Sequence, residues 1–354
     1  MQSIVIWYEP RNTTLKSEIE VHLNYWKIPT KTKNSFSRFL DIGLRLFAAK
    51  EVGKVFVYFP GVVNKSDFEL LYDKISDKDF KLLDTIFNRN LEVLTSVASK
   101  FKKAVDTSSK YSFHYFKQDE TDYNLSSNYK GTVIEFSIPD NTEDNIYFRF
   151  RIKGPSVDNF SLREKPTNSY FESAFTGIEV IDVRLNEVRY QNEQLLTAQV
   201  GKGIFIFKKI HLFLMCCSRE EIFFSHSPFM GCRQLEDEVW NSYIDITSMK
   251  PKEVLLAYHW KKVPDLNKNK EVHDYNVLIK TKFEYNNKLT VLKYLTYIFL
   301  IGIGINIASN YIIKVLNSNR SEPKDNTEIV EGKGIINDEP LDSLPNLVKP
   351  LPVE

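Results

Sequence analysis

Three basic side chains recur at every second position of one short segment, at Arg149, Arg151 and Lys153. Aromatic and aliphatic residues fill the positions between them, and this alternation predicts a strand with one basic and one apolar face. Basic groups on a sheet face can bind the phosphates of a nucleotide or a nucleic acid. Arg149, Arg151 and Lys153 are therefore candidate ligand-binding residues, although a solvated sheet face above an apolar one is the favoured interpretation.

A second polar pattern, at Asp182, Arg184 and Asn186, also falls on one face of a predicted strand. Paired acids on a strand can hold Mg²⁺ in nucleases, but such sites usually add a lysine nearby. No lysine follows at that spacing. An internal charge pair on an exposed strand face is the favoured interpretation.

Thiols and a histidine gather between residues 216 and 232, at Cys216, Cys217, His226 and Cys232. Their spacing matches neither the CxxC nor the HxxxH pattern of metal sites, so buried thiols beside a loop histidine are expected. Three cysteines cannot all pair, which favours a reducing, cytosolic setting. Gly201-Lys202-Gly203 is too short for a phosphate loop. We therefore expect no catalytic residue, metal site or cofactor, and an enzyme is disfavoured.

Charge is nearly balanced along the chain, with a formal net charge of +1. This balance argues against bulk electrostatic capture of nucleic acid. Short basic clusters stand at residues 31–33, 100–103 and 261–262. They would suit anionic lipid headgroups, although a solvated surface is the favoured role.

The strongest signal in the sequence is a stretch of 20 uncharged residues from Tyr294 to Ile313. A helix of this length spans about 30 Å, which is the hydrocarbon thickness of a bilayer. Lys293 and Lys314 bracket the stretch, and tyrosines lie near both of its ends, as at membrane interfaces. The sequence predicts a single transmembrane helix over residues 293–314.

Small and polar residues in this helix group by face. Gly302, Asn306, Ser309 and Asn310 share one face, and a small-xxx-small pair, Gly304 with Ala308, occupies the opposite side. Such faces favour contact between helices in lipid. We expect a homo-oligomer formed through this helix, with a lone anchor as the alternative.

The segments flanking this helix give its expected orientation. Lysines and arginines are nearly balanced on its two sides, so the positive-inside rule decides little. The first ten residues read as a strand rather than a signal peptide, and the expected location is a cell membrane with the N-terminal part cytoplasmic. Residues 315–354 form a polar, proline-containing tail that is predicted to be disordered.

The N-terminal part predicts an α+β fold, with a mixed α/β subdomain over residues 1–110 and a β-rich domain over residues 111–288. Strands are expected at 4–8, 19–25, 54–59, 111–116, 131–138, 146–152, 178–189, 194–200, 204–217, 222–224 and 273–285. The strand at 19–25 alternates apolar residues with Glu20, His22 and Asn24, as a half-buried strand does. Helices are expected from Asn34 or Ser35 through Phe47, from Ser66 through Ile75, near 80–87, and at 234–243 and 252–260.

These features predict a membrane-anchored sensor or effector. The N-terminal domain would bind a nucleotide or protein ligand, and the anchored helices would associate in response. This layout resembles that of membrane effectors of prokaryotic defence systems, as an analogy of architecture without a shared motif. The alternatives are a tethered enzyme acting on nucleotide or nucleic acid, and a passive scaffold for a soluble partner.

Overall fold

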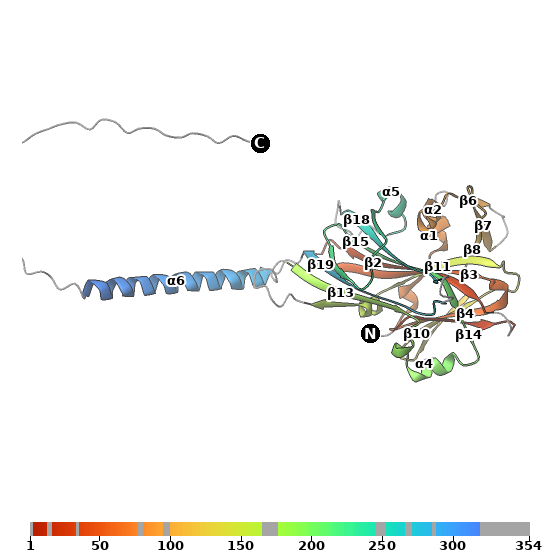
Figure 1. The fold of residues 1–354 in the computed structure, drawn as a ribbon, viewed down its shortest axis with the longest axis horizontal. Helices are drawn as coiled ribbons and strands as arrows, with labels where there is room; N and C mark the ends of the chain where they lie inside the picture. Colours follow the sequence, from red (N-terminus) through yellow and green to blue (C-terminus); the bar gives the residue numbers. More distant parts are fainter. Residues whose placement is uncertain are drawn as a thin grey trace, which may run out of the picture. The chain divides into compact units, whose positions relative to one another are not determined.

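The computed structural model describes residues 3–12, 16–32, 35–76, 81–94, 100–164, 176–244, 253–265, 271–284 and 288–318. Contacts divide the chain into two compact units, Met1–Tyr294 and Leu295–Glu354. The first unit is built mainly from strands, with a few short helices (Figure 1). The fold is therefore sheet-rich, with much less helix than the sequence predicts.

A ten-stranded sheet forms the centre of the first unit. Its strands, in spatial order, are β17 (Gly231–Gln234), β18 (Leu255–Lys262), β15 (Ile206–Cys217), β2 (Glu18–Pro29), β3 (Phe36–Phe47), β11 (Asn145–Lys153), β8 (Ser112–Phe116), β7 (Phe101–Asp106) and β6 (Leu91–Leu94), with β5 (Phe68–Leu70) also pairing with β11. Two neighbouring pairs, β15 with β2 and β11 with β8, are parallel. Strands from both sides of the predicted boundary near residue 110 thus share one sheet.

Two smaller sheets complete the strand framework. The five-stranded sheet runs β14 (Gly203–Ile204), β1 (Val5–Pro10), β4 (Val52–Phe59), β10 (Gly131–Ser137) and β9 (Tyr123–Asn128). The four-stranded sheet runs β12 (Ser161–Glu164), β13 (Thr176–Leu185), β19 (Tyr275–Glu284) and β16 (Glu221–Ser225). A parallel bridge between Ile4 and Leu185 links these two sheets.

The main core lies on one face of the ten-stranded sheet. Alternate residues of β2, including Ile19, Val21 and Leu23, point into it together with residues of β3, β11 and β15. Residues of the five-stranded and four-stranded sheets fill the other side of the same core, among them Val57 and Ile181. The arrangement is a sandwich in which apolar side chains of facing sheets exclude water.

Short helices cover the opposite face of the ten-stranded sheet (Figure 1). They are α1 (Tyr72–Ser76), α2 (Lys81–Phe87) and α5 (Asp237–Trp240), while α4 (Glu193–Ala198) packs on the five-stranded sheet. Short 3₁₀ helices stand at Ala49–Glu51, Lys65–Asp67, Pro155–Phe160 and Val188–Tyr190. Because of this cover, the ten-stranded sheet is buried on both faces over its central strands.

Three predicted elements are wrong, and the helix expected from Ser66 through Ile75 is right only in its last part, because Phe68–Leu70 is strand β5 and α1 is Tyr72–Ser76. The segment from Phe36 to Phe47, expected to be a helix, is strand β3, which pairs along its full length with β2. The expected strand at 194–200 is helix α4, whose first turn is capped by the side-chain oxygen Oδ1 of Asn192 accepting from the Leu195 amide. The expected helix at 252–260 is strand β18.

The error at β3 has a clear cause. Phe36, Phe39, Leu40, Leu44 and Phe47 have the spacing of a helical face, whereas the alternation of Leu40, Ile42, Leu44 and Leu46 with Asp41, Gly43 and Arg45 is the signal of a strand. The helix expected near 80–87 is confirmed as α2, and the one expected at 234–243 is reduced to the four residues of α5.

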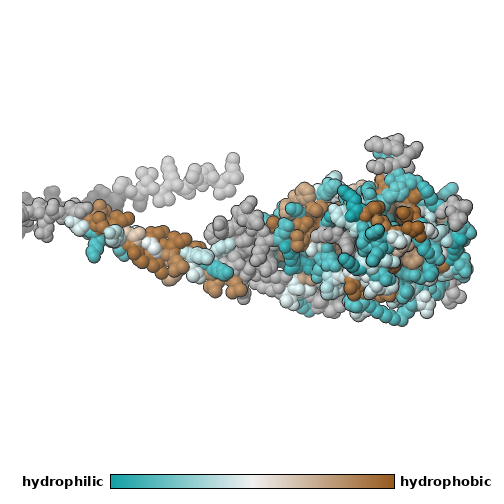
Figure 2. Space-filling view, turned by 90° about the horizontal axis from the view of Figure 1, so that it is seen from below, coloured by the Kyte–Doolittle hydropathy of each residue, from teal (hydrophilic) through white to brown (hydrophobic). Residues whose placement is uncertain are grey.

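The helix near the C-terminus, α6 (Lys288–Ser318), contains the predicted transmembrane stretch. Among the described residues, one helix is long and apolar enough to cross a membrane, and it is α6 over Val291–Ser318. None of its most apolar stretch is buried in the protein. Hydrophobic residues dominate its surface in Figure 2. Of the predicted tail, residues 319–354 lie outside the described residues.

Candidate functional site

The predicted basic strand is β11, and its basic face is buried instead of solvated. Arg149 and Arg151 are each 2% exposed. Arg151 donates from Nε to Asp41 at 2.6 Å and from Nη2 at 3.1 Å, while Arg149 donates to the Tyr243 hydroxyl at 2.8 Å. Tyr243 in turn donates to Asp41 at 2.7 Å. A ligand would have to displace Asp41 or Tyr243 to reach either guanidinium.

Lys153 lies at the end of the same face, where its side chain is partly exposed and pairs with Glu69. Burial opposes ionisation of Glu69, but Lys153 and Lys74 lower its pKa overall. The three predicted ligand-binding residues thus share one strand face, as expected, and each has an acidic or phenolic partner within the protein.

The pattern at Asp182 and Arg184 forms an internal charge pair, as the sequence predicts. The Arg184 guanidinium donates two hydrogen bonds to the Asp182 carboxylate, at 3.0 and 2.6 Å. Asp182 is buried, contrary to the expected exposed face. Asn186 has a structural role, since its side chain bonds the backbone of Ile6 through both its oxygen and its nitrogen.

The thiols and His226 do not converge. Cys216 and Cys217 are buried, whereas Cys232 and His226 are exposed, and all three cysteines are unpaired. Cys217 donates to Glu253 at 2.9 Å. Among the described residues, none of these four belongs to a cluster of potential metal ligands.

A cavity of about 660 Å³ is lined by Gly201, Lys202 and Gly203 with residues of β1 and β14. Its two cationic groups already have acidic partners, because Lys202 pairs with Glu9 and Lys16 with Glu271. The cavity therefore carries no convergent reactive group. Of the basic clusters, Lys100 pairs with Asp119 and Asp122, and Lys262 with Asp274, while Lys33 lies outside the described residues.

A group that the sequence analysis did not select lies at the centre of the ten-stranded sheet. Glu20 and His22, two residues apart on β2, share one face, and His211 of the parallel strand β15 pairs in register with His22. A bulge between Phe207 and Lys209 shifts the register of β15. This shift puts His211 on the same face as Glu20 and His22.

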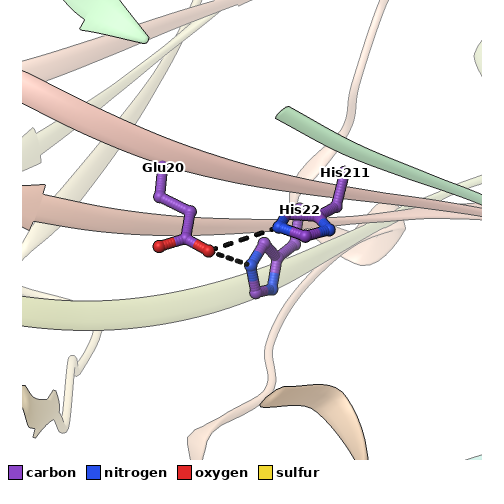
Figure 3. A group of neighbouring side chains, drawn as sticks. All are labelled: Glu20, His22 and His211. Atoms are coloured by element: carbon purple, nitrogen blue, oxygen red, sulfur yellow. Dashed lines mark hydrogen bonds and ion pairs between the residues drawn. The ribbon is translucent and has the colours of Figure 1, made fainter. Parts of the chain in front are cut away.

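The three side chains converge on one carboxylate oxygen (Figure 3). Oε1 of Glu20 lies 3.4 Å from Nε2 of His22 and 3.3 Å from Nε2 of His211. Glu20 and His22 are buried, and the His211 side chain is 17% exposed. Among the described residues, they form the one group of three or more potential metal ligands.

Neighbouring side chains hold this group in place. His211 Nδ1 lies 2.9 Å from Nε2 of His259 on β18, within hydrogen-bond distance. Arg45 of β3 donates to the second oxygen of Glu20 at 3.3 Å. The ring of Phe87, at the end of α2, lies 5.2 Å from that of His22 and covers it. The cluster therefore has a defined orientation.

Burial sets the charge state of these groups. Desolvation lowers the pKa of His22 to about 4, and desolvation with the nearby His211 lowers the pKa of His259 to about 4. For Glu20, desolvation opposes ionisation, yet hydrogen bonds from His211 and His22 lower its pKa far below the usual value. At neutral pH Glu20 is thus a carboxylate and His22 a neutral imidazole, the ionisation states that metal ligands require.

The cluster has access to a pocket. His211 and His259 line a cavity of about 300 Å³ between β15, β17, β18 and α2. A small cavity of about 10 Å³ lined by His22 and Trp240 shares the lining residues Thr85 and Phe213 with it. A carboxylate, two imidazoles and a pocket are compatible with metal binding or with proton transfer.

The sequence contains one signal for this site. Glu20, His22 and Asn24 alternate with apolar residues, and this pattern correctly predicts a strand. The prediction that the strand is half-buried is wrong, because both faces of β2 are buried. Three ionisable or polar groups on a strand that is buried on both faces would have pointed to a site. The partner His211 lies in a distant strand, so its proximity is not visible in the sequence.

The residues predicted for helix association all lie on α6. Asn310 donates from Nδ2 to Oδ1 of Asn306 at 3.0 Å, so both amides lie on one side of the helix. Apart from the helix's own backbone and the adjoining residues, no atom of the described residues lies within 4 Å of a Cβ built on Gly302 or Gly304.

The sequence matches no protein-family model and no curated protein.

Proposed function

We propose that this chain is a single-pass membrane protein whose N-terminal unit binds a ligand or partner in the cytoplasm and whose helix α6 self-associates in the bilayer. The observation that supports it best is the exposure of α6. Large apolar side chains such as Phe299, Ile301 and Ile307 are more than half exposed, and none of the apolar window is buried in the protein. Water would disfavour such a surface, whereas lipid would solvate it.

Self-association follows from the polar face of α6. The hydrogen bond between Asn310 and Asn306 uses one donor and one acceptor. An asparagine side chain offers two donors and an acceptor with two lone pairs, so most of their capacity is left for other partners. In hydrocarbon these groups gain by bonding a second helix, and Gly302 and Ser309 on the same face allow close approach.

Binding by the N-terminal unit is supported by its buried polar sheet face. A structural sheet face that packs against helices is usually apolar, because buried polar groups cost free energy unless they are paired. This one carries Glu20, His22 and His211 beside a pocket of about 300 Å³. Pockets with a few convergent polar groups are the usual form of ligand sites.

The oligomer can be tested with two matched double variants of the full chain in detergent. Asn306→Leu with Asn310→Leu removes both asparagine side chains from the polar face of α6. Ile301→Leu with Ile305→Leu changes residues at the same spacing on another face of this helix. We expect the wild type and the isoleucine control to sediment as oligomers. The asparagine variant should associate about 3- to 30-fold more weakly, since such hydrogen bonds contribute about 0.6–2 kcal/mol.

A monomeric wild type, or an asparagine variant that associates as strongly as the control, would contradict self-association through this face. Both variants should still fractionate with membranes, because neither substitution adds charge. Loss of membrane fractionation by the isoleucine control would contradict the assignment of α6 as the anchor.

Orientation can be tested with Cys232, which is exposed in the N-terminal unit. If that unit is cytoplasmic, a membrane-impermeant maleimide should label Cys232 after cells are permeabilised and not before. Cys232→Ser is the control, because Cys216 and Cys217 are buried. Labelling of Cys232 in intact cells would place the unit outside.

The cellular role that matches this layout is a membrane-perturbing effector of the kind found in prokaryotic defence systems. It predicts that expression with the activating ligand depolarises cells and that the asparagine variant does not. A tethered enzyme would instead keep its activity after removal of residues beyond Lys288, and a scaffold would co-purify with its partner.

A further inference from the structure

We propose that Glu20, His22 and His211 bind a divalent transition-metal ion, with Zn²⁺ the preferred one. The site goes beyond the proposed function and does not depend on helix α6. The proposal rests on the arrangement of three potential ligand atoms around one point, on two paired strands of the sheet.

Distances within the cluster fit a metal site. Zinc binds imidazole nitrogen and carboxylate oxygen at about 2.0–2.2 Å, so two ligand atoms at tetrahedral corners are about 3.3–3.5 Å apart. The Glu20 oxygen lies 3.4 Å from the His22 nitrogen and 3.3 Å from the His211 nitrogen. Hydrogen bonds from N–H to oxygen are usually 2.7–3.2 Å, so both contacts are longer than direct bonds prefer.

The backbone fixes the relative positions of the three side chains. Parallel pairing fixes His22 opposite His211, and the two-residue period of β2 puts Glu20 on the same face. Sites built on strands hold their ligands more exactly than sites on loops. Binding would therefore need little rearrangement of the chain.

Outer contacts also match those of metal sites. Metal-binding imidazoles usually bond a second group through the other ring nitrogen, which fixes the tautomer. Here Nδ1 of His211 has His259 as that partner, and the second oxygen of Glu20 has Arg45. The atoms that face the centre are therefore the ones left to coordinate.

Donor chemistry selects the metal class. Two imidazoles and one carboxylate suit zinc and ferrous iron, whereas Mg²⁺ and Ca²⁺ prefer oxygen ligands throughout. Three protein ligands leave at least one position open for water or a ligand. The pocket lined by His211 and His259 gives space for such a group.

The competing explanation is a cluster held by protons, in which both imidazoles donate to Glu20. The two explanations differ in whether the purified chain takes up metal. The experiment uses the full chain in detergent, stripped with a chelator, then titrated with Zn²⁺ by calorimetry and with Co²⁺ by absorption. We expect one ion per chain, and Co²⁺ bands of the intensity typical of a tetrahedral site.

Three variants locate the binding. His211→Gln should weaken zinc binding by about 100-fold or more and abolish the Co²⁺ bands. His259→Gln, which removes a supporting contact, should weaken binding by about 10- to 100-fold. His226→Gln is the matched control, because this exposed histidine lies outside the cluster, and it should bind as the wild type does.

Circular dichroism and thermal unfolding establish that each variant is folded. Equal zinc affinity for folded His211→Gln and the wild type would overturn the proposal, since binding would then lie elsewhere. Should His211→Gln fail to fold, the wild type decides, because absence of stoichiometric uptake or of tetrahedral Co²⁺ bands overturns the site by itself. These outcomes are independent of the sedimentation assay for α6.

Discussion

The two faces of the central strand β2 are both buried but are held by different forces. On one face Ile19, Val21 and Leu23 join the main apolar core. On the other face Glu20 and His22 are as inaccessible to water, yet their contacts are with charged, polar and aromatic groups. Burial alone therefore does not distinguish a structural face from a candidate functional one, whereas the chemistry of the buried groups does.

The difference extends across the ten-stranded sheet. Burial of the apolar face stabilises the fold by about 25 cal/mol per Å² of surface removed from water, and this contribution depends little on the direction of the contacts. The polar face gains little net free energy from its ion pairs, because desolvation offsets most of their attraction. A buried polar face that adds little stability suggests a role other than stability. Removal of one partner should nevertheless lower the free energy of unfolding strongly, because it leaves a buried polar or charged group unpaired.

The largest effect is expected for Asp41→Asn, a change of nearly equal shape on the polar face. Asp41 faces Arg151 at 2.6 Å and Arg149 at 3.7 Å, so the variant leaves two buried guanidiniums without a counter-charge. Breaking one partner of a buried pair costs about 3–5 kcal/mol. Urea unfolding of the full chain in detergent, followed by tryptophan fluorescence, measures the loss. A loss below about 1 kcal/mol would contradict the ion-pair account.

The ion pairs of Asp41 should also make the stability of the protein depend on pH. Burial would raise the pKa of Asp41, but the coulombic attraction and hydrogen bonds of Arg151, with Arg149, lower it below the usual value of 3.8. A depressed pKa contributes stability that is present above pH 3.8 and is lost as pH falls towards the folded-state value. The stability of Asp41→Asn should therefore fall less between pH 4 and pH 2 than that of the wild type.

The contrast between faces also explains what the sequence could predict. Strands such as β1, β4 and β11 follow from short alternating or apolar runs, and α6 follows from length and the absence of charge. Strand β3 has a period of two from Leu40 to Leu46, but Phe39 and Phe47 on its other face add the spacing of a helix, so the two patterns compete. The partners of the polar face come from distant strands, and the bulge in β15 that aligns His211 has no local sequence signature.

The next largest effect is expected from zinc itself. A ligand that binds the folded state at 100 times its Kd stabilises that state by about 2.7 kcal/mol. Zinc at that concentration should shift the urea midpoint of the wild type and of His226→Gln upward, and shift that of His211→Gln much less, because zinc then only reaches the weakened Kd of this variant. An equal shift in all three would show that zinc acts outside the cluster on the polar face.

Overpacking of the polar face should have a smaller effect. A Cβ added at Gly43 of β3 would lie 2.3 Å from the Tyr147 hydroxyl oxygen, so Gly43→Ala forces that buried side chain to move. Insertion of one methyl group into a packed site costs about 1–3 kcal/mol. Gly53→Ala is the control, because its Cβ would meet its nearest atom at 3.5 Å. Equal urea midpoints for the two variants would mean that the polar face is loosely packed.

The smallest effect is expected for Ile42→Val on the apolar face. Ile42 neighbours Asp41 in β3 but points into the main core, where it pairs across the strands with Leu23 and Phe150. Loss of one methylene costs about 0.5–1.5 kcal/mol, because the neighbours close part of the space and no charge is left unpaired. The same urea titration measures it. If Ile42→Val cost as much as Asp41→Asn, the two faces would respond alike, and the polar face would have no special dependence on its partners.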